Sequence, residues 1–108
     1  MKRMIKSSEE SNKYIIVTPS GDRADLTNGY EYKDGALYRN AVAGQFLDSK
    51  RPTRVVGKWK IYVNSFPDAA YPYSVARIAD SETGEVYRFE FPQGYGILKD
   101  IVEHLRSM

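Results

Sequence analysis

Five cations and three aromatic residues lie close together in one part of this sequence, and they are its best candidates for recognition chemistry. The cations are Lys50, Arg51, Arg54, Lys58 and Lys60, and the aromatic residues are Trp59, Tyr62 and Phe66. No acidic residue lies among them, so residues 49–67 carry five of the 16 basic residues and the remainder of the chain has 11 basic against 14 acidic residues. This segregated charge predicts a basic strand that faces a binding partner.

Two kinds of macromolecule fit such a strand. On one extended strand, Lys58, Lys60 and Tyr62 would point from the same face at intervals of about 7 Å, which suits successive phosphates, and the tyrosine could stack on an unpaired base. The following loop adds aromatic residues of the kind that anchor protein interfaces. We therefore predict partner-binding residues Arg54, Lys58, Lys60, Tyr62, Phe66, Tyr71 and Tyr73, and in the nucleic-acid alternative Lys50, Arg51, Arg54, Lys58 and Lys60.

The acidic segment 80–85 has the composition of a calcium-binding loop but not its spacing. The twelfth position counted from Asp80 is Phe91, where a bidentate glutamate is needed, and Gly84 stands at the fifth position instead of the sixth. We predict a turn here and no metal site.

Catalytic motifs are weak throughout the chain. There is no cysteine, and the one histidine, His104, lies between Glu103 and Arg106 near the end of a predicted helix, where we expect it to be exposed. Residues 21–25 hold two carboxylates and an arginine in a predicted turn, and residues 94–96 could present amides to an anion. We predict no catalytic residues and no cofactor, with an enzyme that uses carboxylate chemistry as the third alternative.

Length and composition indicate one small globular domain. The 108 residues are 42% hydrophobic and 28% charged, without a signal-like apolar run or the roughly 20 apolar residues that a membrane span needs. We expect a soluble, cytoplasmic protein that does not bind membranes. Residues 1–12, with Lys2, Arg3 and Lys6, are predicted to form a mobile arm, and residues 13–108 a single domain.

The first half of the domain is predicted to be β-rich. Residues 14–18 are largely β-branched and should form a buried strand that ends in a turn at 19–22. Residues 30–33 and 36–39 flank Asp34-Gly35, a pair typical of a tight type I′ hairpin. A helix over residues 36–47 is the rival interpretation, and a helical turn over 41–47 is compatible with the hairpin.

Residues 54–63 alternate as expected for one strand with a single buried face. One face would hold Val55, Gly57, Trp59, Ile61 and Val63, and the other Arg54, Val56, Lys58, Lys60 and Tyr62. An irregular loop over residues 66–72 contains two prolines. Trp59 is accordingly predicted to lie in the core.

The second half predicts a hairpin followed by a helix. Residues 73–79 and 85–91 should pair around a turn over 80–84 in which Gly84 adopts a positive φ. From Ile97 to Arg106 an apolar stripe recurs at helical spacing and should pack on the sheet. The fold class is α+β: a twisted antiparallel sheet of four to six strands with a C-terminal helix on one face.

These features favour binding over catalysis. The preferred interpretation is a noncatalytic module, such as a small regulator or inhibitor of the kind that phages and mobile elements encode, which docks on a protein partner through the basic strand and the aromatic loop. A nucleic-acid-binding protein that uses residues 50–60 and the N-terminal arm is the alternative. The sequence does not specify the oligomeric state.

Overall fold

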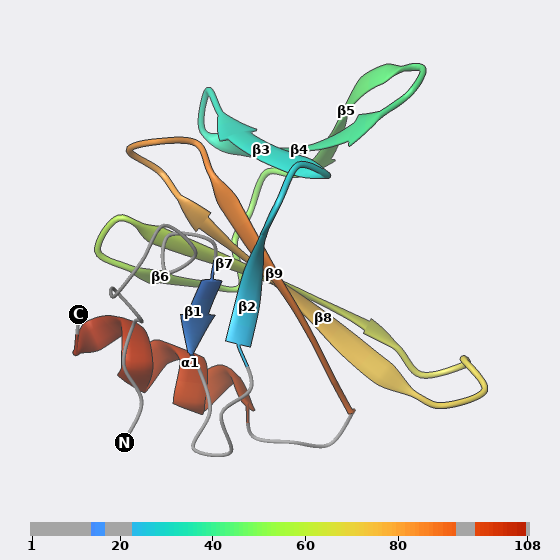
Figure 1. Cartoon of the computed structure of the whole chain (residues 1–108), viewed down its shortest axis with the longest axis vertical. Helices are drawn as coiled ribbons and strands as arrows, with labels where there is room; N and C mark the ends of the chain where they lie inside the picture. The colour runs from blue at the N-terminus through green and yellow to red at the C-terminus, as the bar shows by residue number, and fades with distance from the viewer. Residues whose placement is uncertain (1–13, 17–22, 93–96, 108) are drawn as a thin grey trace.

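A computed structural model describes residues 14–16, 23–92 and 97–107, which form two antiparallel sheets and one C-terminal helix (Figure 1). In chain order the elements are β1 (Tyr14–Ile16), β2 (Arg23–Thr27), β3 (Tyr30–Lys33), β4 (Ala36–Ala41), β5 (Gly44–Ser49), β6 (Arg54–Val56), β7 (Trp59–Phe66), β8 (Tyr73–Asp80), β9 (Val86–Pro92) and α1 (Ile97–Arg106). The α+β class is thus supported, but the chain is mostly sheet and the second sheet was not predicted.

The larger sheet has six strands in the order β1-β2-β9-β8-β7-β6, and α1 covers one of its faces. The core between them combines strand residues with one stripe of the helix: Ala24, Trp59, Ile61, Ala76, Ile78, Tyr87, Phe89, Phe91, Ile101, Val102 and Leu105. Both the predicted helix and the core position of Trp59 are confirmed. Burial of these side chains provides the main stabilisation of the helix, since a ten-residue helix is marginal alone.

The smaller sheet, with strand order β3-β4-β5, lies on the opposite side of the six-stranded sheet from α1 (Figure 1). Leu37 joins Tyr62, Ala79 and Val86 in a second core cluster between the two sheets. The amide of Tyr32 donates a hydrogen bond to the Gly84 carbonyl at 3.0 Å, which links β3 to the β8–β9 turn. The central strand β8 is consequently covered on both faces and is nearly all buried.

The predicted β3–β4 hairpin is confirmed. Asp34 and Gly35 have φ values of 52° and 78°, as a type I′ turn requires. The rival helix over residues 36–47 is wrong, and so is the helical turn over 41–47, because this segment forms β4 and β5. The local alanine and leucine residues favour a helix, but two effects outweigh this preference. The segment pairs with β3, and Leu37 is buried between the two sheets.

The predicted β8–β9 hairpin is also confirmed, with β9 beginning at Val86. Gly84 has a φ of 85°, and its amide donates to the Asp80 carbonyl at 2.8 Å. A Cβ atom at Gly84 would lie 2.9 Å from the Tyr32 carbonyl oxygen. Glycine is therefore required here both by the turn and by the close approach of β3.

Some predictions fall on residues outside the described part of the chain. These are the arm at 1–12, the end of the first strand with its turn at 17–22, and the glycines at 94 and 96. Residues 14–16 form the edge strand β1, as predicted in part. Across the described ranges, no helix has the length and apolar character that a bilayer crossing demands.

Candidate functional site

The predicted basic strand is two strands joined by a tight turn. β6 ends at Val56, Gly57 adopts a φ of 57°, and β7 begins at Trp59. Arg54 pairs with Ile61 and therefore shares the helix-covered face, since directly opposite residues of an antiparallel pair lie on one face. The predicted face that joined Arg54 to Lys60 is wrong. Because the turn contains two residues, inward and outward positions still appear to alternate along the sequence. The residues before the turn nevertheless lie on the opposite face of the sheet from the one that a continuous strand would give them.

Lys58 lies in this turn and not on a strand face. Its Nζ is 3.0 Å from an Asp80 carboxylate oxygen, 3.9 Å from Glu82 and 4.9 Å from the Trp59 ring centroid. Burial alone would raise the pKa of Asp80, but hydrogen bonds from Lys58 and from the amides of Glu82 and Thr83 outweigh burial and lower that pKa. Lys58 thus connects the β6–β7 turn to the β8–β9 turn.

Tyr62 was predicted to face a partner, and this orientation is wrong. Only 2% of its surface is exposed, because the three-stranded sheet covers it together with Leu37 and Val86. Burial, reinforced by nearby Tyr32, raises the pKa of Tyr62 to about 12, although the Arg77 guanidinium acts in the opposite direction. A side chain in this position belongs to the packing between the sheets.

Arg77 is a buried, ion-paired residue that the sequence analysis did not single out. It is 1% exposed in the middle of β8, and its Nη1 donates to an Asp48 carboxylate oxygen of β5 at 2.5 Å. Its guanidinium carbon also lies 5.1 Å from the centroid of the Tyr30 ring of β3. One buried cation therefore contacts two strands of the smaller sheet. The signal was a lone arginine in the apolar run Val75-Ala76-Arg77-Ile78-Ala79.

The other predicted basic residues do not gather on one surface. Lys50 and Arg51 are exposed in the segment between β5 and β6, Lys60 is half-buried on the face opposite α1, and Arg54 is exposed on the α1 side. Within the described ranges none of these four forms an ion pair. The regular row of cations predicted for one strand is absent.

Three predicted aromatic residues do come together, at the end of the β7–β8 hairpin. Phe66 and Tyr73 are paired across the strands and their rings stack, with centroids 4.9 Å apart and planes at 21°. Phe66 is 40% exposed and Tyr71 is 87% exposed. A groove of about 250 Å³ beside them is lined by Tyr71, Pro72, Tyr73, Glu90 and Phe91. We call Phe66, Tyr71 and Tyr73 the aromatic tip; Figure 1 shows this hairpin end projecting away from α1 and from the smaller sheet.

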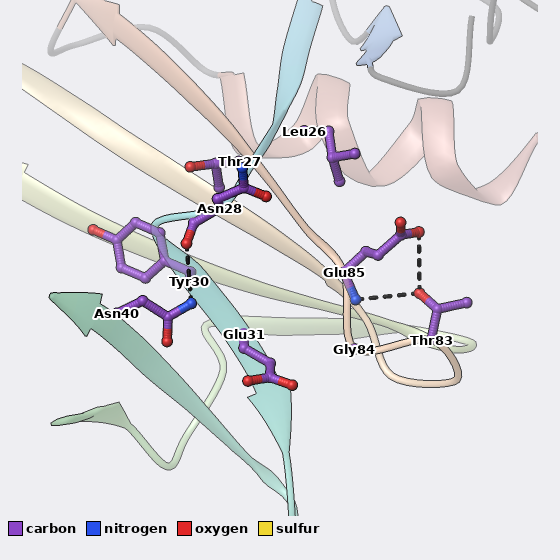
Figure 2. A pocket seen from close by; sticks show the side chains of 9 residues that line it. All are labelled: Leu26, Thr27, Asn28, Tyr30, Glu31, Asn40, Thr83, Gly84 and Glu85. Carbon is purple, nitrogen blue, oxygen red and sulfur yellow. Dashed lines mark hydrogen bonds between the residues drawn. The ribbon is translucent and has the colours of Figure 1, made fainter. Parts of the chain in front are cut away.

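A pocket of about 300 Å³ lies where the β2–β3 and β8–β9 connections meet (Figure 2). Its polar groups bond to neighbours: Asn40 donates to the Asn28 carbonyl at 3.0 Å, and Glu31 accepts from Gln45 at 2.9 Å. Glu85 comes from the separate β8–β9 turn, where its amide donates to the Thr83 hydroxyl at 3.2 Å. The pocket is therefore a junction between turns whose polar groups hold the turns together. These contacts do not place a proton donor and a proton acceptor together for catalysis.

His104 was predicted to be exposed, and this is wrong. It is 4% exposed, because it follows Ile101 by three positions and therefore lies on the buried stripe of α1. Its charged sequence neighbours point elsewhere on the helix. In the described part of the chain, no three His, Cys, Asp or Glu side chains gather as they would around a metal ion.

The smaller sheet carries an exposed apolar edge that the sequence analysis did not identify. Val42 in the β4–β5 turn is fully exposed, and Phe46 and Leu47 of β5 are 53% and 49% exposed. Phe46 and Leu47 are adjacent and point to opposite faces of β5, so neither face of the strand is covered here, and residue types that are ordinary for a strand gave no sign of this.

Comparison with known protein families, curated proteins and solved structures yields no match for this chain.

Proposed function

We propose that this chain is a noncatalytic binding module that docks on a protein partner through the aromatic tip. The observation that carries the proposal is the exposure of Tyr71 beside the stacked Phe66 and Tyr73 rings. Large aromatic side chains contribute much of the free energy of protein interfaces, and they tend to do so in well-packed pockets. The stack limits the side-chain freedom of two of these rings before binding, which reduces the entropy lost on association.

The charges near the tip favour protein over nucleic acid. Asp68 lies in the connecting loop, and Glu90 forms part of the groove wall, where it is paired with Arg88 at 2.7 Å. A phosphate backbone would approach acidic side chains here without a nearby row of cations. The groove can instead receive one apolar side chain of a partner between Tyr71 and Phe91.

The role of the module as a small regulator or inhibitor belongs to the same proposal. It acts by occupying a surface of its partner and needs no chemistry of its own. The nucleic-acid alternative stays a prediction: a protein of this kind would use Lys50, Arg51, Arg54, Lys58 and Lys60 with the N-terminal arm, and its affinity would fall steeply with salt.

The test replaces Tyr71 with the photo-crosslinking residue benzoylphenylalanine and captures partners from the native host with and without nuclease. Val42, which is also highly exposed but lies in the β4–β5 turn of the smaller sheet, provides the control position. The proposal is supported if a protein still crosslinks at position 71 after nuclease treatment and does not crosslink at position 42. This crosslink should also be lost when Phe66→Ala is introduced. Recovery that nuclease abolishes, or equal crosslinking at both positions, contradicts it.

A further inference from the structure

A second surface feature lies between β6 and α1, on the opposite side of the larger sheet from the smaller one. It is a groove of about 260 Å³, lined by Arg54, Leu98, Lys99, Val102, Glu103 and Arg106. The reversal of the chain at Gly57 places Arg54 on this side, against the helix. The groove therefore combines residues that are more than 40 positions apart in sequence.

The walls of the groove are basic. The lining contains three cations, Arg54, Lys99 and Arg106, and one carboxylate, Glu103, so its net charge is +2. None of the three cations forms an ion pair with a residue that the structure describes. Three cations on so small a surface repel one another, and an anionic partner would relieve that repulsion.

The floor of the groove is apolar. Leu98 is partly buried against the core and Val102 is 7% exposed, and both line the groove. An apolar group of a partner placed there would extend the core cluster outward and lose its contact with water. The groove thus offers one apolar subsite with cations around it.

We propose that this groove binds an acidic, apolar peptide segment of a partner protein. One apolar side chain would rest on Leu98 and Val102, and flanking carboxylates would meet the three cations. Lys99 and Arg106 are seven residues apart on the helix, which separates them by about 10 Å along its axis. In an extended peptide, residues four positions apart share one face and lie about 13 Å apart, so two acidic residues at this spacing can reach the ends of both long cationic side chains, with the apolar residue midway between them on the same face.

A nucleic acid fits the groove less well than such a peptide. Glu103 lies between Lys99 and Arg106 along the helix and would repel a continuous phosphate backbone, whereas a peptide can place a neutral residue beside it. The apolar floor also has no counterpart in a sugar–phosphate chain. This proposal is independent of the aromatic tip, because the two surfaces share no residue.

The test measures fluorescence anisotropy of labelled peptides in which two glutamates, two to four positions apart, flank a leucine or phenylalanine. A matched peptide set replaces the glutamates with glutamine, another replaces the apolar residue with serine, and a single-stranded oligonucleotide is titrated alongside. Amide and methyl NMR shifts of the full chain locate the site. Thermal melting of each protein variant confirms that folding is unchanged.

We expect each of Arg54→Gln, Lys99→Gln and Arg106→Gln to weaken binding of the acidic peptide about two- to fivefold, as exposed ion pairs do. Glu103→Gln should strengthen it about twofold. The control variants Lys33→Gln and Arg39→Gln remove the same charge on the smaller sheet and should leave affinity nearly unchanged. Shifts should centre on Leu98 and Val102.

Three results would overturn the proposal. One is that no acidic peptide of the set binds at concentrations up to about 1 mM. Another is that the glutamine or serine peptides bind as tightly as the parent, since then neither charge nor apolar contact selects the ligand. The third is that the oligonucleotide binds the groove more tightly than any peptide and that Glu103→Gln strengthens oligonucleotide binding further. That result would identify the groove as a phosphate site.

Discussion

Replacing Asp48 by asparagine should destabilise the protein far more than the sequence suggests. Asp48 lies in an exposed strand, yet its carboxylate accepts a hydrogen bond at 2.5 Å from Arg77, whose side chain is 2% exposed. Asparagine has a similar shape but no charge, so the guanidinium would stay buried without a counter-ion. Breaking a buried pair in this way typically costs about 3–5 kcal/mol. Because Asp48 is itself 20% exposed, we expect about 3 kcal/mol.

The two partners should respond unequally. Arg77→Met removes the buried charge and leaves a carboxylate that can reach water, so we expect it to cost about 1 kcal/mol, and the double variant should be more stable than Asp48→Asn alone. The matched control is Glu90→Gln, which breaks the Arg88–Glu90 pair at 2.7 Å, with side chains 39% and 54% exposed, and should cost less than about 1 kcal/mol.

Urea unfolding followed by tryptophan fluorescence measures these free energies, and the NMR signals of β3 and β5 report whether the smaller sheet detaches. Equal costs for Asp48→Asn and Glu90→Gln would refute the reasoning, since Arg77 would then not depend on Asp48. A double variant no more stable than Asp48→Asn would show that the arginine contributes through packing and not through its charge.

The remaining predictions concern β7 and its turn. Trp59→Ala should lower the free energy of unfolding by about 3–5 kcal/mol, measured by urea titration with circular dichroism, because it empties a buried aromatic site; a change below about 1 kcal/mol would contradict the core position. Lys60→Glu should change stability by less than about 0.5 kcal/mol, whereas Lys58→Glu should cost about 1 kcal/mol because it places a like charge beside Asp80; equal melting temperatures of the two variants would show that the Lys58 contacts do not stabilise the fold. The raised pKa of Tyr62 means that the folded state keeps its proton while the unfolded state loses it, so stability is fully present below about pH 10 and should fall as the pH rises toward about 12. Tyr62→Phe should flatten this alkaline decline in a pH series of urea titrations, and an unchanged slope would assign the decline to another group.

Local chemistry was enough to predict two of the hairpins and the helix. Asp34-Gly35 and Gly84 adopt the positive φ values that their turns need, and few other residues do so without strain. The apolar stripe of α1 repeats at the helical period, so its burial followed from spacing alone. The aromatic tip was likewise accessible to sequence reasoning, because Phe66, Tyr71 and Tyr73 flank a proline-containing loop that must turn at the surface.

The basic residues between positions 49 and 67 show what the sequence by itself determined and what the tertiary structure decided. The alternation of residue types set the inward direction of Trp59 and Ile61, but the same alternation continues through the turn at Gly57 and hides the reversal that sends Arg54 to the α1 side. Tyr62 points away from α1 as its pattern required, yet that face is buried because a second sheet packs on it. Periodicity reports how a residue is oriented relative to its own strand; whether that side meets water depends on contacts between distant segments, and here those contacts are made by Arg77, Asp48 and the smaller sheet.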